Sequence, residues 1–110
     1  MVEFKSKMQS SENTTELKKR LNGETAKIAW HELQKHYASG NVLVVAQGFD
    51  LIEIAIAMHH DDTAKIKQWL GKCALLEVSN NQAQDWYDNN STVWALVIPP
   101  FVLVQEVKVT

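Results

Sequence analysis

A chain of 110 residues is long enough for one domain, which should bury about two-thirds of its unfolded surface. Its 45% hydrophobic and 22% charged content is typical of a soluble globular protein, and a net charge of −2 excludes the strong field that attracts nucleic acid or anionic lipid. The single cysteine excludes an intrachain disulfide, and no apolar run is long enough to span a bilayer, so we expect a cytoplasmic protein without nucleic-acid or membrane partners.

The first residues are polar and differ from the remainder of the chain. Residues 1–14 hold few apolar side chains, which predicts a mobile tail, and residues 15–110 are expected to form a single domain. Leu17 and Leu21, four positions apart, begin a helical pattern.

A clearer helical pattern follows. One apolar stripe with helical spacing is made by Ala26, Trp30, Leu33 and Tyr37. Gly40 follows the stripe in the way a helix stop does, so we predict one helix over this stretch.

Two apolar runs are separated by turn residues. Val42–Ala46 is continuously apolar and predicts a strand, and Gln47–Asp50 has the composition of a turn. Residues 51–58 place Ile52, Ile54, Ile56 and Met58 at alternate positions, which favours a second strand. A buried helix is the alternative, because nearly every position of this run is apolar.

Acidic and hydroxyl side chains mark the start of two later helices. Asp61, Asp62 and Thr63 provide an N-cap and first-turn acid, and the following stripe consists of Ile66, Trp69, Leu70 and Cys73. After a short strand, Leu75–Val78, the sequence from Ser79 to Gln82 fits a capping box. Behind this box we expect Ala83, Trp86 and Tyr87 to face inward.

The chain closes with two apolar runs, Val93–Ile98 and Phe101–Val107, and Pro99-Pro100 between them predicts a bend or turn. The whole order predicts an α+β fold, with a single, mostly antiparallel sheet of about five strands covered by three or four helices. Its core should draw on Trp30, Trp69 and Trp86.

Three strings of residues resemble a known family. They are Leu21-Asn22-x-Glu24-Thr25-Ala26-Lys27-Ile28-x-Trp30, Asp50-Leu51-Ile52-Glu53-Ile54-Ala55, and Pro100-Phe101-Val102-Leu103-Val104-Gln105. The chain resembles, over roughly residues 17–106, a family of short bacterial proteins catalogued as domain of unknown function 2288. The resemblance implies no activity, cofactor or catalytic residue.

The densest group of ligand-type side chains is His59-His60-Asp61-Asp62, with Asp50 and Glu53 upstream. On a strand, His59 and His60 would point to opposite faces, and the two aspartates serve as helix-start residues. We therefore predict no metal site and no cofactor.

Glu53 interrupts an apolar run. If its face is covered, the carboxylate needs a partner such as Lys27 or a backbone donor; otherwise it lies at a solvent-facing edge or acts as a general base.

These patterns predict a small module that binds a protein or small-molecule partner. The alternative is a hydrolase or lyase that uses Asp50 and Glu53 with His59 or His60. Because the last two runs are apolar on both faces, we also predict a homodimer, with Phe101 and Leu103 as interface candidates.

Overall fold

The computed structural model describes residues 14–107, from the first helix to just beyond the last strand. Its helical segments are α1 (Thr14–Glu24), the 3₁₀ helix η3 (Trp30–Leu33), α2 (Gln34–Ala38), α3 (Leu51–His59), α4 (Thr63–Gly71) and α5 (Asn80–Asp88). Its strands are β1 (Ala26–Ala29), β2 (Val42–Val45), β3 (Leu75–Glu77), β4 (Thr92–Ile98) and β5 (Phe101–Glu106). The tail predicted for residues 1–14 lies outside the described residues, except for Thr14, which begins α1.

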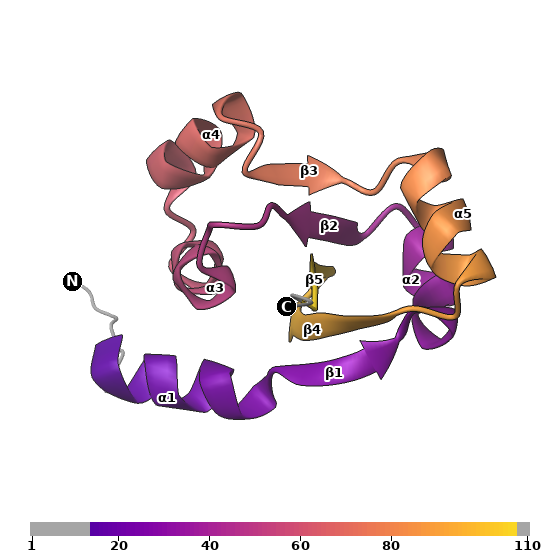
Figure 1. Ribbon diagram of the computed structural model, residues 1–110. Coiled ribbons are helices and arrows are strands. Elements are labelled where there is room, and N and C mark those ends of the chain that lie inside the picture. Colours follow the sequence, from indigo (N-terminus) through magenta and orange to yellow (C-terminus); the bar gives the residue numbers. More distant parts are fainter. Residues whose placement is uncertain (1–13, 108–110) are drawn as a thin grey trace.

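The strands form one sheet in the order β1-β4-β5-β2-β3. β4 is antiparallel to β1 and to β5, β2 is antiparallel to β3, and β2 and β5 are parallel. The predicted turn at Pro99-Pro100 is confirmed, because it connects the paired residues Ile98 and Phe101. Figure 1 shows β5 almost end-on between β4 and β2, so the sheet is strongly twisted. The predicted α+β fold with a single sheet is confirmed, and the sheet is mixed rather than purely antiparallel.

The helix predicted from Ala26 to Tyr37 is wrong in its first part. Ala26–Ala29 forms β1, in which Ala26 pairs with Ala95 of β4. The 3₁₀ turn begins only at Trp30, whose backbone N–H donates to the Ser91 carbonyl at 2.8 Å. The spacing is misleading because Ala26 is exposed, whereas the later members of the stripe do contact the core.

The strand predicted for residues 51–58 is also wrong, and the alternative reading, a buried helix, is what forms. α3 begins after Asp50, whose Oδ1 accepts a hydrogen bond from the Ile52 N–H at 2.9 Å. Four of its side chains are buried at helical spacing: Leu51, Ile54, Ala55 and Ala57. An apolar run fits either periodicity, and here the N-cap indicates the helix.

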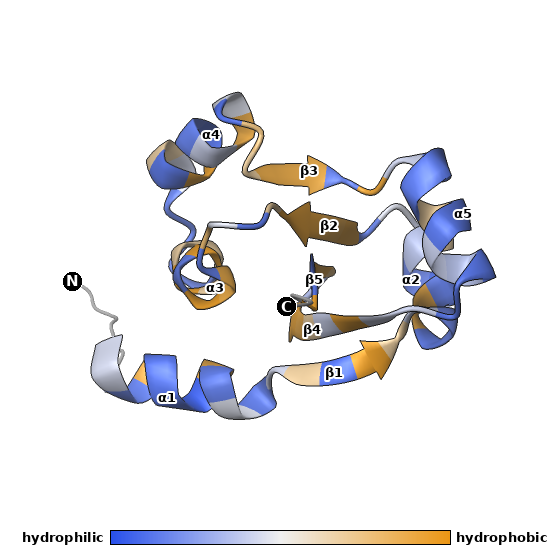
Figure 2. Ribbon diagram, viewed as in Figure 1, coloured by the Kyte–Doolittle hydropathy of each residue, from blue (hydrophilic) through white to orange (hydrophobic). Residues whose placement is uncertain are grey.

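Helices cover both faces of the sheet. η3, α2 and α5 pack on what we call the α5 face, and α1, α3 and α4 lie over the opposite, α3 face (Figure 1). Alternation along β5 separates the two cores, because Val102 and Val104 belong to the α5 face and Leu103 to the α3 face. In Figure 2 the apolar colour is concentrated on the strands and the outward helix surfaces are largely hydrophilic.

The four tryptophans are not equally buried. Trp30 and Trp86 are buried on the α5 face with ring centroids 4.9 Å apart, as predicted. Trp69 is less completely buried than these two, and it packs against the core of the α3 face. It lies on α4, a helix at the β3 end of the sheet that buries no residue completely.

Three further side chains predicted to face the core are exposed instead: Leu70, Cys73 and Tyr87. Among residues 14–107, no helix is both long and apolar enough to cross a membrane, and the cytoplasmic location stays a prediction.

Candidate functional site

The residues predicted as catalytic lie at opposite ends of α3. Asp50 caps the first turn, whereas His59 lies in the last turn and His60 is the C-cap, about 13 Å further along the axis. The two imidazole rings meet edge to face, with centroids 5.3 Å apart, and both histidines are exposed. Glu53 is exposed on the first turn of α3, so its carboxylate faces solvent, which is one of the alternatives considered for it. The structure therefore does not gather these side chains around one substrate.

Of the two aspartates after the histidines, Asp62 caps a helix. Asp62 is the N-cap of α4, and its Oδ1 accepts a hydrogen bond from the Lys65 N–H at 3.3 Å. Within residues 14–107, no three His, Cys, Asp or Glu side chains are grouped so as to hold a metal ion. The absence of a metal in the protein itself stays a prediction.

The predicted interface residues belong to the middle of the sheet. β5 is the central strand, Leu103 is 0% exposed in the core of the α3 face, and Phe101 is half-buried. The exposed sheet edges are instead β1 and β3. β4 and β5 each have a neighbouring strand on both sides, so neither offers an open edge for pairing with a second copy.

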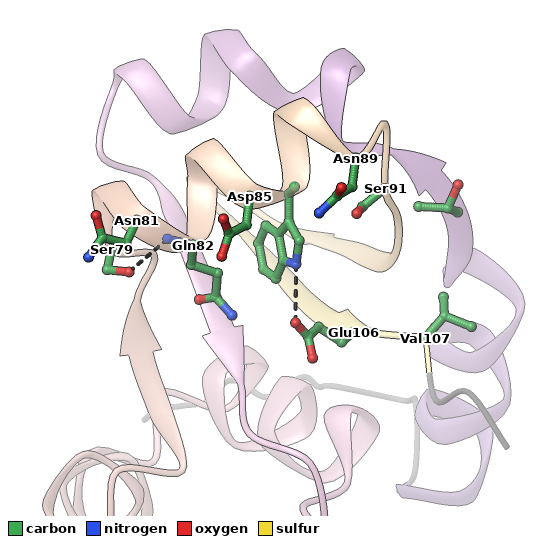
Figure 3. A pocket seen from close by; sticks show the side chains of 10 residues that line it. Ser79, Asn81, Gln82, Asp85, Asn89, Ser91, Glu106 and Val107 are labelled. Atoms are coloured by element: carbon green, nitrogen blue, oxygen red, sulfur yellow. Dashed lines mark hydrogen bonds between the residues drawn. The ribbon is translucent and has the colours of Figure 1, made fainter.

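A hollow of about 850 Å³ is a groove beside α5, which we call the α5 groove. In Figure 3 the side chains of Gln82 and Asp85 lie on the α5 side of the groove, and those of Glu106 and Val107 face them from the end of β5. The Trp86 indole N–H donates to the Glu106 carboxylate at 3.1 Å.

The α5 groove is a weak candidate for ligand binding. Apart from Trp86 and Val107, its lining consists of polar side chains, most of them exposed. Binding sites for small molecules are mostly apolar with a few converging polar groups, which does not describe this surface. The Glu106 carboxylate is also held by the Trp86 indole.

A second hollow, of about 430 Å³, lies between the end of α1 and the start of α3. We call it the aromatic cleft. It is lined by Asn22, Thr25, Phe49, Asp50, Leu51, Ile52, Trp94 and Gln105. Half of these residues are aromatic or aliphatic and half are polar, so the lining is more apolar than that of the α5 groove and combines apolar surface with polar groups, as ligand sites do.

The loop before α3 is held in place by a glutamine of the central strand. The Gln105 side-chain amide donates to the carbonyls of Ala46 and Phe49 at 3.1 and 2.8 Å. Gly48 provides the positive φ of 94° that the turn requires. Because two backbone carbonyls are tied to β5, the position of Phe49 beside the cleft is fixed.

Thr25 and Asp50 also have local hydrogen bonds, as Gln105 does. The Thr25 hydroxyl donates to the Leu21 carbonyl at 2.8 Å, and Asp50 caps α3 through one carboxylate oxygen. Trp94 lies opposite Lys27 in the β1–β4 pair, and the Lys27 ammonium is 5.1 Å from the Trp94 ring centroid. This contact is a cation–π interaction.

Sequence reasoning identified only one cleft residue, Asp50, as a candidate. Phe49 gives a weak local signal, because a large aromatic side chain in a Gly-containing turn has no helix or strand face to occupy. Trp94 was assigned to a strand. Gln105 could not be identified from the sequence, because only the order of the strands in the sheet places its side chain beside the loop that precedes α3.

The fold and the cleft define a class of protein: a single-sheet α+β domain with helices on both faces and a cleft at the junction of two of them. The chain belongs to the family described as "Protein of unknown function (DUF2288)", which matches residues 16–106. The family resemblance expected from the sequence is thereby confirmed.

A solved structure has the same fold. PA1075 from Pseudomonas aeruginosa, determined in solution by NMR, is 38% identical, and the match covers 96% of this chain and 95% of that one with a TM-score of 0.74. No curated protein of known function matches the chain. Neither comparison assigns an activity.

Proposed function

We propose that the protein is a binding module that holds a small ligand in the aromatic cleft. The observation that carries this proposal is the pair of incompletely buried aromatic side chains, Phe49 and Trp94, that line one hollow together with Asp50. Exposed aromatic surface is costly in a folded protein and is retained where a partner covers it.

The dimensions of the cleft support this role. Its volume of about 430 Å³ lies within the range of roughly 300–1,000 Å³ that is usual for ligand pockets. Phe49 is 37% exposed although the Gln105 amide holds its backbone, so the side chain stands at the rim of a pre-formed site. A pre-formed site loses less conformational entropy on binding than a mobile loop does.

The enzymatic alternative receives no support of this kind. A hydrolase or lyase built on Asp50 and a histidine needs both side chains within reach of one substrate, and α3 separates them along its length. We therefore base the proposed function on binding.

Binding is tested with three small probes of one shape: 2-phenylethylamine, 2-phenylethanol and 3-phenylpropionate. We expect at least one to shift the NMR signal of the Trp94 indole, assigned with a Trp94→Phe variant. Phe49→Ala should weaken this shift, because it removes one wall of the cleft.

Tyr87→Ala is the matched control, since Tyr87 is an exposed aromatic residue on the opposite face of the sheet. It should leave binding unchanged. If none of the three probes shifts the Trp94 signal, or if Tyr87→Ala rather than Phe49→Ala weakens the shift, the cleft is not the binding site.

A further inference from the structure

We propose that the aromatic cleft selects an organic cation, in which an ammonium or guanidinium group is joined to an apolar body. This inference rests on the proposed function and adds the chemical class of the ligand. It follows from the charge of the lining, the hydrogen bonds already made there, and the carbonyl end of α1.

Asp50 has the only formal charge among the residues that line the cleft. One of its carboxylate oxygens accepts from the Ile52 N–H, and the other has no hydrogen-bond partner within residues 14–107. An unpaired carboxylate oxygen beside aromatic side chains favours a positively charged donor.

The hydrogen bonds of the lining point in the same direction. The Thr25 hydroxyl and the Gln105 amide both donate to backbone carbonyls. They can therefore offer a ligand only their oxygen atoms as acceptors. A donor-rich ammonium or guanidinium group complements such acceptors, and a carboxylate ligand does not.

The end of α1 beside the cleft also favours a cation. Asn22 lies in the last turn of α1, which has no basic side chain to offset the negative, carbonyl end of the helix dipole. The opposite wall is the start of α3, whose dipole alone would attract an anion. Asp50 already places a carboxylate there.

The face of Trp94 already attracts one cation, the Lys27 ammonium. Lys27 is therefore the like charge that a cationic ligand in the cleft must meet. Removing that charge should strengthen binding, whereas removing the Asp50 charge should weaken it.

The probes of the binding experiment test this selection directly. We expect 2-phenylethylamine to bind more tightly than 2-phenylethanol, and 3-phenylpropionate to bind least. Asp50→Asn should weaken amine binding roughly fivefold, the scale of one exposed ion pair. The α3 cap survives this change, because Asn caps helices as well as Asp does. Lys27→Gln should strengthen amine binding.

Asp62→Asn is the matched control, because Asp62 makes the same type of cap on α4 outside the cleft lining. It should leave the affinity for the amine unchanged. Equal binding of all three probes would overturn the cation inference and leave the binding function standing. Amine affinity that falls as much in Asp62→Asn as in Asp50→Asn would also overturn it.

Discussion

Trp30 shows at the residue scale how this core tolerates a polar atom. Its side chain is 0% exposed and its indole N–H has no hydrogen-bond partner within residues 14–107. Its ring centroid lies 5.6 Å from that of Tyr37 and 4.9 Å from that of Trp86. An unpaired buried donor costs about 1–3 kcal/mol, and the burial of a large ring against two aromatic neighbours offsets that cost.

Trp30→Ala should therefore destabilise the domain by about 3–5 kcal/mol, the usual cost of truncating a buried aromatic side chain. Trp69→Ala should cost less, about 1–2 kcal/mol, because Trp69 is half-buried on a helix that buries no residue completely. Chemical denaturation followed by circular dichroism measures both. Equal losses of unfolding free energy in the two variants would show that α4 packs more tightly than its exposure indicates.

Single residues with a local partner could be predicted from the sequence. Asp62 and Ser79 cap helices as their positions indicate, because a cap needs only backbone N–H groups within the next turn. The aromatic cleft could not be predicted in this way. Phe49 and Gln105 are 56 positions apart, and only the completed sheet brings them into contact.

At the scale of helices and strands, the caps were better guides than apolar periodicity. Residues 51–58 alternate as a strand does, and yet Asp50 begins a helix there. The stripe from Ala26 includes a four-residue edge strand whose partner, β4, lies far along the chain. Pairing with a distant strand leaves no local trace, so spacing alone could not distinguish β1 from a helix.

The start of α5 provides a test at this scale. Ser79 Oγ accepts a hydrogen bond from the Gln82 N–H at 3.1 Å. Ser79→Ala removes this cap and should destabilise the domain by about 1 kcal/mol. Ser79→Asp should retain the stability, because Asp is an equally good cap and its charge suits the helix dipole. Thermal unfolding of the two variants compares them, and equal losses would exclude a capping role.

For the whole molecule, the presence of one sheet followed from the sequence, whereas the strand order did not. The expected number of about five strands agrees with the structure only because the unpredicted β1 replaces the strand wrongly predicted for residues 51–58. Sequential strands usually pair, which is true of β4 with β5, but β5 also pairs in parallel with the distant β2. This order places the last strand in the centre and leaves β1 and β3 at the edges. A homodimer stays a prediction, and its strand pairing would need one of those edges.

Leu103→Lys tests this arrangement. Because Leu103 is 0% exposed, the buried ammonium should destabilise the domain by at least about 4 kcal/mol and abolish most of its structure, rather than dissociate an assembly. Val97→Lys on the neighbouring strand should be tolerated, since Val97 is 52% exposed. Far-UV circular dichroism and sedimentation equilibrium distinguish the outcomes. A folded, monomeric Leu103→Lys protein from a dimeric parent would place Leu103 at an interface instead.

The central position of β5 has a consequence for synthesis on the ribosome. β1 and β4 contact β2 and β3 within the sheet only through β5, which is the last of the five strands to be made. Until residues 101–106 have emerged, a nascent chain carries two half-sheets whose inner edges are unpaired and apolar. Such edges are the surfaces that chaperones bind and that aggregation uses. The sheet is thus completed late, and a chain that stops before residue 101 cannot complete it.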